Sequence, residues 1–307
     1  MSQAGQDRPS VLRAARERTR AEITRQILDA ARRHLATEGA SGLSLRAIAR
    51  ELGASSSAVY RYVASRDELL TRLIVAAYHA LGAAAEAREA AVARADLAGR
   101  WSAVCSAVRD WALANPNEYA LIYGTPVPGY TAPSATIAPA ARVSNVLLGI
   151  LADAAGHLTP AIADDVPPGD RKALVPARTT VPPEIPDALL HRGLMAWAAL
   201  FGTVSFELFG HFNGIVGDQP SDREAFFAES VRRWATQVGI APGYTGPEAR
   251  KPGHHPEPVG TAETTTTAQV LENITQPDRG RSELMTSAPQ GETRTTASAS
   301  TPNTPLS

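Results

Sequence analysis

The fold of this chain is decided by residues 27–70, which read ILDAARRHLATEGASGLSLRAIARELGASSSAVYRYVASRDELL. A helix that begins at Thr19 runs into this stretch, because its apolar residues recur three or four positions apart until Gly39. A short second helix follows with Ser44 as its N-cap, and Gly53 is placed to end it in the left-handed conformation. One apolar face is expected on each helix, made of Ile23, Ile27, Ala30, Ala31 and Leu35 in the first and of Leu45, Ile48, Ala49 and Leu52 in the second.

A third helix is predicted over residues 56–63, with Ser55 as its N-cap and with Val59 and Val63 on its buried face. Residues 53–55 alone separate it from the second helix, which is the spacing of a helix-turn-helix motif over about 44–63. A solvated helix in an ordinary bundle would also be polar, so the spacing by itself is weak. The third helix, however, offers hydroxyl and guanidinium groups that suit phosphate oxygens and base edges, namely Ser55, Ser56, Ser57, Tyr60, Arg61 and Tyr62.

The uneven distribution of charge favours a DNA-binding interpretation. The whole chain has 30 basic and 31 acidic residues, whereas residues 1–63 have 11 arginines against 6 acidic residues. A basic module on an acidic body indicates a polyanion partner for the first module alone. Residues 1–18 are expected to form a flexible basic arm, and the arginines in and beside it to add salt-dependent affinity without specificity: Arg8, Arg13, Arg16, Arg18 and Arg20.

The rest of the chain predicts an all-α fold of about nine helices, because the alternation typical of strands is missing. Ser65 and Glu68 form a capping box for a fourth helix that ends near Ala95. Further helices are expected at about 96–114, 116–123, 136–157, 187–212 and 221–238, with loops at 124–134 and 159–186. The predicted domains are a helix-turn-helix DNA-binding domain at 19–66, a helical effector-binding and dimerisation domain at 67–241, and a disordered Thr/Pro/Ser-rich tail at 242–307.

The helix at about 187–212 is apolar on two faces, which requires two neighbours. One seam is expected to face the subunit's own core and consists of Leu190, Leu194, Trp197, Phe201, Val204 and Leu208. The other stripe, from Met195 to Phe209, is mostly small and allows a second helix to approach closely. A symmetric pairing of the last two helices with those of a second copy would then have an interface that includes Ala198, Gly202, Ser205, Phe209, Phe226 and Trp234.

A ligand cavity is expected among the helices of the second domain, where the large aromatic side chains are found. The candidate lining residues are Trp101, Trp111, Tyr119, Tyr123, Trp197 and Phe201. Taken singly, each of them fits an ordinary core position better, whereas the group as a whole favours a pocket with an apolar lining. Cys105 is the single cysteine, so it can form no disulfide within the chain, and a small buried core residue is the better interpretation of it than a redox sensor.

Other classes of protein find little support in the sequence. The folded part has no glycine-rich phosphate loop, no nucleophile elbow and no carboxylate pair or metal-ligand spacing, so neither an enzyme, a cofactor nor a metal is expected. His254 and His255 stand in the predicted tail without further ligands. No run reaches the ~18 apolar residues of a membrane helix, and a cytoplasmic protein is expected. Two rivals remain, an architectural DNA-binding protein without a ligand and a helical interaction bundle that binds no DNA.

Residues 27–70 also resemble the N-terminal DNA-binding domain of the TetR-type bacterial transcriptional regulators, including Tyr60 and the helix start at 66–70. Ser57 and Val63 stand where that family usually has glycine and phenylalanine. The resemblance implies phosphate contacts for Ser44 and Ser55 and backbone contacts for Tyr60 and Arg66. It also implies base readout by Ser56, Ser57, Ala58, Arg61 and Tyr62, and Arg46 joins the expected DNA-binding set.

Residues 196–211 are similar to the penultimate helix of the subgroup named for Trp, His and Gly, with Phe201 where its histidine is expected. What the resemblance implies is a repressor that binds a palindromic DNA operator as a homodimer. A small apolar or aromatic effector would release it.

Overall fold

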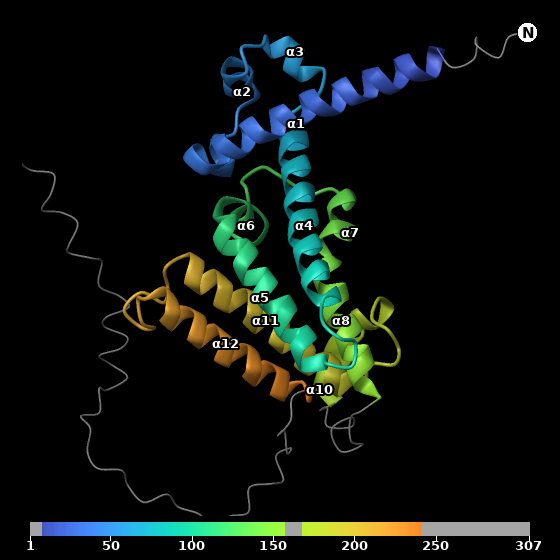
Figure 1. The fold of residues 1–307 in the computed structure, drawn as a ribbon, viewed down its shortest axis with the longest axis vertical. Helices are drawn as coiled ribbons and strands as arrows, with labels where there is room; N and C mark the ends of the chain where they lie inside the picture. Colours follow the sequence, from blue (N-terminus) through green and yellow to red (C-terminus); the bar gives the residue numbers. More distant parts are fainter. Residues whose placement is uncertain (1–7, 157–167, 241–307) are drawn as a thin grey trace, which may run out of the picture. The chain divides into compact units, whose positions relative to one another are not determined.

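The computed structural model describes residues 8–156 and 168–240, and within these ranges the chain is helical and has no strand (Figure 1). Every described residue belongs to a single compact unit. The all-α prediction is confirmed. The described part has eleven α-helices rather than about nine, because two short helices, α7 (Ile137–Ala140) and α10 (Pro168–Leu174), occur where one long helix and a loop are predicted. The predicted disordered tail, 242–307, lies outside the described residues.

The first three helices are α1 (Arg8–Gly42), α2 (Leu45–Glu51) and α3 (Ser56–Tyr60). Ser44 and Ser55 cap α2 and α3 as predicted, and Gly53 lies at φ +62°, the left-handed conformation that the turn between the helices requires. A closed apolar core joins the three helices to the start of α4. The buried residues in it include Ile27, Ala30, Ala31, Leu35, Leu45, Ile48, Ala49, Val59, Val63, Leu69, Leu70 and Leu73.

The expectation of a flexible arm over residues 1–18 is wrong from Arg8 onward, because α1 already begins there. This segment is rich in alanine, arginine and glutamate, which favour helix, and Arg13 pairs with Glu17 one turn further along at 3.0 Å. Residues 15–22 are exposed on every side of the helix. Helix propensity and continuation from the anchored part of α1 therefore account for this segment, not burial.

Helix α4 (Arg66–Ala90) begins at the predicted capping box, with Ser65 Oγ accepting the Glu68 N–H at 3.1 Å. The Glu68 carboxylate in turn accepts the Ala64 N–H at 2.7 Å. This helix belongs to both cores, since Leu69, Leu70 and Leu73 lie in the first and Leu81 and Ala85 in the second. It ends before the predicted Ala95, and Asp96 caps the next helix by accepting the Gly99 N–H at 2.8 Å.

The second core is built by α4, α5 (Leu97–Ala114), α6 (Pro116–Tyr123), α8 (Arg142–Ala155), α11 (Asp187–Leu208) and α12 (Pro220–Gln237) (Figure 1). The single helix predicted over 136–157 is wrong. A 3-10 turn, η1 (Ser134–Thr136), leads into α7 (Ile137–Ala140), and the axis bends by 43° before α8. Pro139 can donate no backbone hydrogen bond, which weakens the ladder at the bend.

Helix α8 leans on α4 at Gly82, where an added Cβ would lie 2.7 Å from the Cβ of Arg142. The glycine thus allows the Arg142 guanidinium to bond the Glu86 carboxylate at 2.8 Å and the His79 carbonyl at 2.7 Å. The loop predicted over 159–186 is wrong in part, because it contains α10 (Pro168–Leu174) and the 3-10 turn η2 (Ala177–Thr179). Leu174 and Ile185 are buried and tie this segment to the second core.

No single helix in the described ranges has both the length and the apolar composition to cross a membrane. The bent pair at 134–140 and 142–155 meets those two criteria when taken together, as core helices of globular proteins also do.

Candidate nucleic-acid interface

Helix α3 presents a polar outer face on a firmly packed base. Val59 and Val63 are buried under it, whereas Ser57, Tyr60 and Arg61 are exposed. Ser55 Oγ accepts the Ala58 N–H at 3.2 Å and lies 3.1 Å from Ser57 Oγ, so the first turn is held by its own hydroxyl groups. The other predicted contacts on this helix, Ser56, Ala58 and Tyr62, are half-buried at its edges.

The neighbouring helix α2 adds cations that no carboxylate neutralises within the described part of the chain. Arg46 and Arg50 are exposed and, like Arg61, form no ion pair there. The arginines on the middle of α1 behave differently: Arg25 bonds Glu22 at 2.6 Å, Arg32 bonds Asp29 at 2.7 Å and Arg33 bonds Glu51 at 2.6 Å. Part of the positive surplus of the N-terminal module therefore lies on the α2–α3 face. Sequence reasoning missed Arg50, although it follows Arg46 by one helical turn.

Arg66, which the resemblance assigns to the DNA backbone, is engaged inside the protein. Its guanidinium donates to the carbonyl of Ala40 at 2.9 Å and lies 3.5 Å from that of Ser41, at the end of α1. The side chain thus holds the α1–α2 connection against the start of α4. Ser44 also works as a cap, accepting the Ala47 N–H at 3.5 Å while it stays half-buried.

A second feature of this module is a cavity of about 580 Å³ between the N-terminal turns of α1 and the end of α3, here named the α1–α3 groove. Its lining residues are Ala15, Arg16, Thr19, Arg20, Arg61 and Tyr62. The Arg20 guanidinium stacks over the Tyr62 ring at 5.5 Å from its centroid. Three arginines and no carboxylate therefore face this groove.

The aromatic residues that are expected to line one cavity lie in different parts of the helical body. Tyr123 packs on Phe201 at 4.4 Å and on Tyr119 at 5.1 Å between ring centroids, and Phe201 packs on Trp197 at 5.5 Å. Burial raises the pKa of Tyr123 and, less strongly, that of Tyr119, which donates to the Phe201 carbonyl at 3.1 Å. Trp101 is buried elsewhere in the same core. Trp101, Tyr119, Tyr123 and Phe201 therefore pack within the core and do not line one common cavity.

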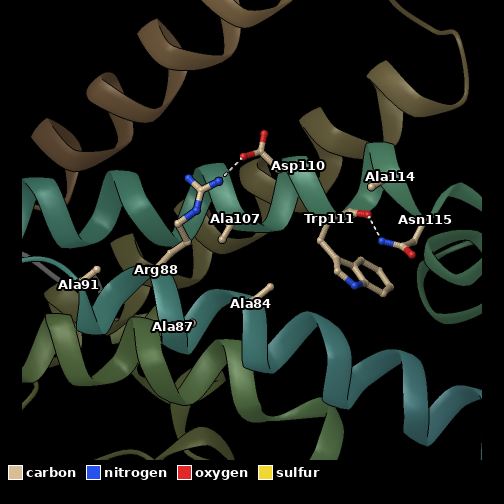
Figure 2. Close-up of a pocket in the computed structure, with 9 residues that line it drawn as sticks. All are labelled: Ala84, Ala87, Arg88, Ala91, Ala107, Asp110, Trp111, Ala114 and Asn115. Atoms are coloured by element: carbon tan, nitrogen blue, oxygen red, sulfur yellow. Dashed lines mark hydrogen bonds and ion pairs between the residues drawn. The ribbon is translucent and has the colours of Figure 1, made fainter.

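Cavities do occur in the described part of the helical body, and two of them lie between its long helices. One, of about 260 Å³, lies between α8 and α11 and is lined almost entirely by apolar side chains: Leu147, Leu148, Leu151, Val181, Leu190, Gly193, Leu194 and Trp197, with Ser144 as its one hydroxyl. The other is an open groove of about 470 Å³ between α4 and α5, with Trp111 at one end and alanines along its walls (Figure 2). Figure 2 also shows the Arg88–Asp110 ion pair, 2.8 Å long, that joins the two helices across this groove.

Helix α11 and the start of α12 carry an apolar face that the described subunit leaves open. Its members are Met195, Ala198, Gly202, Phe206, Phe209 and Phe226, and an added Cβ on Gly202 would touch nothing within 4 Å. Ser205 turns inward instead and lies 3.0 Å from the Tyr119 hydroxyl. Trp234 is half-buried, with its ring 6.2 Å from that of Phe227.

The predicted inner seam of α11 is wrong at two positions, because Leu194 and Trp197 are 41% and 38% exposed. The helix is rotated so that Leu189, Gly193, Ala196 and Leu200 take the buried places. Small residues at 193 and 196 bring α11 close to its neighbours, which a spacing of bulky residues alone does not reveal.

Comparison with known proteins agrees with this geometry. Residues 27–73 match the model of bacterial regulatory proteins of the tetR family, and residues 101–234 match that of the tetracyclin repressor-like C-terminal domain. The HTH-type transcriptional regulators Rv1816 of Mycobacterium tuberculosis and Mb1846 of Mycobacterium bovis are each 41% identical over 206 residues, which are 64% of this chain and 85% of theirs. The crystal structure of the regulatory protein SCO4313 is 37% identical, covers 71% of this chain and 97% of its own, and has a TM-score of 0.59.

A capped recognition helix with unpaired cations beside it, carried by an all-helical body, defines a helix-turn-helix DNA-binding transcriptional regulator. The chain belongs to the TetR family. Its members are DNA-binding regulators and not enzymes, in agreement with the sequence analysis. The description of the family model that matches residues 101–234 does not mention the Trp-His-Gly subgroup, so membership of that subgroup stays a prediction.

Proposed function

We propose that this regulator is a cytoplasmic repressor that binds a palindromic operator as a homodimer and is released by a small apolar or aromatic effector. The observation that carries the proposal is the open apolar face of α11 and α12. Paired with its own copy about a two-fold axis, the same face buries itself and places two α3 helices on one DNA duplex. A palindrome with half-sites about one helical turn apart, roughly 34 Å, is the matching target.

The proposed DNA contacts follow from which polar groups of each side chain are exposed or still able to form a hydrogen bond. Ser57 and Tyr60 on α3 face outward for bases and phosphates, and Arg46 on α2 has no partner in the described ranges and suits phosphate. Ser44 and Ser55 act first as helix caps, with a second lone pair left for a donor. Arg66 supports the interface by holding the end of α1.

The proposed effector site is the 260 Å³ cavity between α8 and α11. Its apolar lining, with the hydroxyl of Ser144 as its polar exception, selects a molecule of about one ring system with few polar groups. Leu194 and Trp197 line this cavity and belong to α11, the helix that also carries the proposed dimer face. Occupation of the cavity would therefore act on the spacing of the two recognition helices.

Footprinting on the DNA that flanks the chain's own coding region tests this proposal. A protected short palindrome supports it, whereas binding without a preferred sequence points to the rival architectural role. Thermal-shift screening of small apolar compounds tests the effector, since a bound ligand raises the unfolding temperature by mass action. A hit must also weaken operator binding; stabilisation without release would contradict the repressor mechanism.

Gly202→Leu tests the dimer face with a matched control. A leucine there meets open space in the subunit but would overpack a close helix pair, at a cost of about 1–3 kcal/mol for each copy. Gly149→Leu on α8 is the control, because an added Cβ there also touches nothing within 4 Å. Sedimentation should show monomers for Gly202→Leu alone, with loss of tight operator binding. A dimeric Gly202→Leu variant that binds DNA normally would place the interface elsewhere.

A further inference from the structure

The N-terminal turns of α1 are unusual because they form a helix without a buried face. Residues 15–22 are exposed, and the first core residue of the helix is Ile27. Figure 1 shows these turns continuing beyond the part of α1 that packs on α2 and α4. Burial does not explain a helical segment that is exposed on every side and anchored at one end, so its role is sought in the side chains on its surface.

That chemistry is concentrated on one side. Arg16 and Arg20 line the α1–α3 groove together with Arg61 of the recognition helix, whereas Arg18 is absent from its lining. The 100° turn per residue explains the difference, since position 18 points away from positions 16 and 20. The groove is thus positive on both walls, one wall being the end of α3, the helix proposed to lie in the major groove of DNA.

No carboxylate of the described chain neutralises this groove by an ion pair. The charge of Arg20 does act on Glu68, whose pKa is lowered mainly by the hydrogen bond from the Ala64 N–H, with Arg72 and the charge of Arg20 as further causes. Its carboxylate is already bonded to Ala64 at 2.7 Å and to Arg72 at 2.5 Å. The Arg20 guanidinium is held in place by the Tyr62 ring instead.

We propose that the α1–α3 groove holds phosphates of the DNA backbone beside the half-site that α3 reads, with Arg16, Arg20 and Arg61 as their ligands. This inference rests on the proposed operator binding and assigns Arg61 to the backbone rather than to a base edge. Guanidinium groups match phosphate oxygens in geometry as well as in charge. From residue 8 to residue 20 the helix rises about 18 Å, which spans about five base pairs of duplex.

The test compares Arg16→Ala and Arg20→Ala with Arg18→Ala as the matched control. Alanine is the best helix former, so none of the three should unfold α1. Affinity for a random-sequence 30-base-pair duplex is measured against salt concentration. Each lost phosphate contact should lower the slope of log K against log salt by about 0.9, which is about an eightfold loss at 0.1 M salt. Arg18→Ala should keep the wild-type slope.

Equal slope losses in all three variants would overturn the inference, because they would describe a diffuse basic surface. Unchanged slopes in Arg16→Ala and Arg20→Ala would also overturn it and point to an acidic protein partner for the groove. Since the duplex has no operator, this test stands even if footprinting finds no palindrome and the proposed function fails.

A second measurement uses the segment that footprinting protects. Base pairs are removed one at a time from its outer end, and affinity is measured for the wild type and for the Arg16→Ala/Arg20→Ala double variant. The affinity of the wild type should fall at the step that removes the phosphates bound by Arg16 and Arg20. The affinity of the double variant should not change at that step. Parallel losses in both proteins would show that the phosphates are bound elsewhere. Arg61→Ala should weaken binding equally for every base change in the operator; relaxed preference at one symmetric pair of positions would return Arg61 to base readout.

Discussion

Replacing Arg100 by alanine tests the ion network that ties α4, α5 and α8 together. The Arg100 side chain is 3% exposed, and its guanidinium bonds the Glu89 carboxylate at 2.6 Å, the Asp153 carboxylate at 2.7 Å and the Arg94 carbonyl at 3.2 Å. The two carboxylates come from the end of α4 and from α8, while Arg100 lies in the first turn of α5. Its removal leaves two half-buried negative charges that face each other without the cation between them.

The expected cost is large but below that of a fully buried pair. Breaking a buried ion pair costs about 3–5 kcal/mol because an uncompensated charge remains. Here Glu89 and Asp153 are 21% and 26% exposed, and Arg94 still bonds Asp153 at 2.7 Å. Water and Arg94 therefore offset part of the loss, and we expect Arg100→Ala to lower the free energy of unfolding by about 2–3 kcal/mol.

Arg88→Ala is the matched control, because Arg88 also joins α4 to α5 through an ion pair. Its bond to Asp110 is 2.8 Å long, but the two side chains are 55% and 52% exposed. An exposed pair of this kind contributes about 0–1 kcal/mol. Urea unfolding at pH 7 measures both variants. An Arg100→Ala protein that loses no more stability than Arg88→Ala would refute the assignment of the network as a stabilising contact.

The same network predicts a pH dependence. Burial alone would raise the pKa of Asp153, but the hydrogen bond and charge of Arg100, together with Arg94, hold that pKa below its usual value of 3.8. The folded chain therefore binds this proton less readily than the unfolded chain, so the stabilisation is complete above about pH 4 and is lost as the pH falls through the folded pKa. The stability difference between wild type and Arg100→Ala should narrow over that window. A difference that stays constant down to pH 3 would contradict the cause given for it.

Two further predictions concern the recognition helix and the buried thiol. Ser55→Ala removes the cap of α3, so it should lower the free energy of unfolding by about 1 kcal/mol and weaken operator binding. Ser57→Ala leaves the bond between Ser55 and Ala58 intact, so it should weaken operator binding with little change in urea unfolding. Equal stability losses in the two variants would show that Ser55 is not the effective cap. Cys105 is buried, and burial raises the pKa of its thiol. A thiol reagent at pH 8 should therefore label the native protein only when the second core opens, and it should label the less stable Arg100→Ala variant faster. Fast labelling of the wild type would show that the second core opens locally.

The helix-turn-helix unit could be predicted in detail because its signals are local. Ser44, Ser55 and Ser65 each cap the helix that follows, and Gly53 takes the positive φ that its turn requires. Short helices of this kind depend on caps and on a few buried residues, all of which stand within one or two turns of each other in the sequence. The extension of α1 was harder, because periodicity detects burial and this segment has none.

The orientation of α11 could not be predicted for a different physical reason. The helix has apolar residues on almost every side. The predicted seam, whose residues follow one another at intervals of three or four positions, is therefore only one of several possible buried faces. The choice depends on neighbours far away in sequence, such as Leu151 of α8 and Tyr119 of α6. For the same reason, the sequence could identify the large aromatic residues but could not predict which of them share a cavity. In the structure, Trp111 and Trp197 line different cavities.

In the proposed mechanism, α4 would connect the effector cavity to the DNA-binding module. Leu147 and Leu151 of α8 line the proposed effector cavity, and the Arg142 side chain of α8 packs directly on α4 at Gly82, which has no side chain of its own. The first half of α4 is part of the core that supports α3. A ligand that spreads α8 from α11 must therefore either compress the α4–α8 contact or move α4, and close-packed interiors yield little by compression. In the proposed mechanism, movement of α4 would carry the recognition helix with it, because α4 contributes buried residues to both cores.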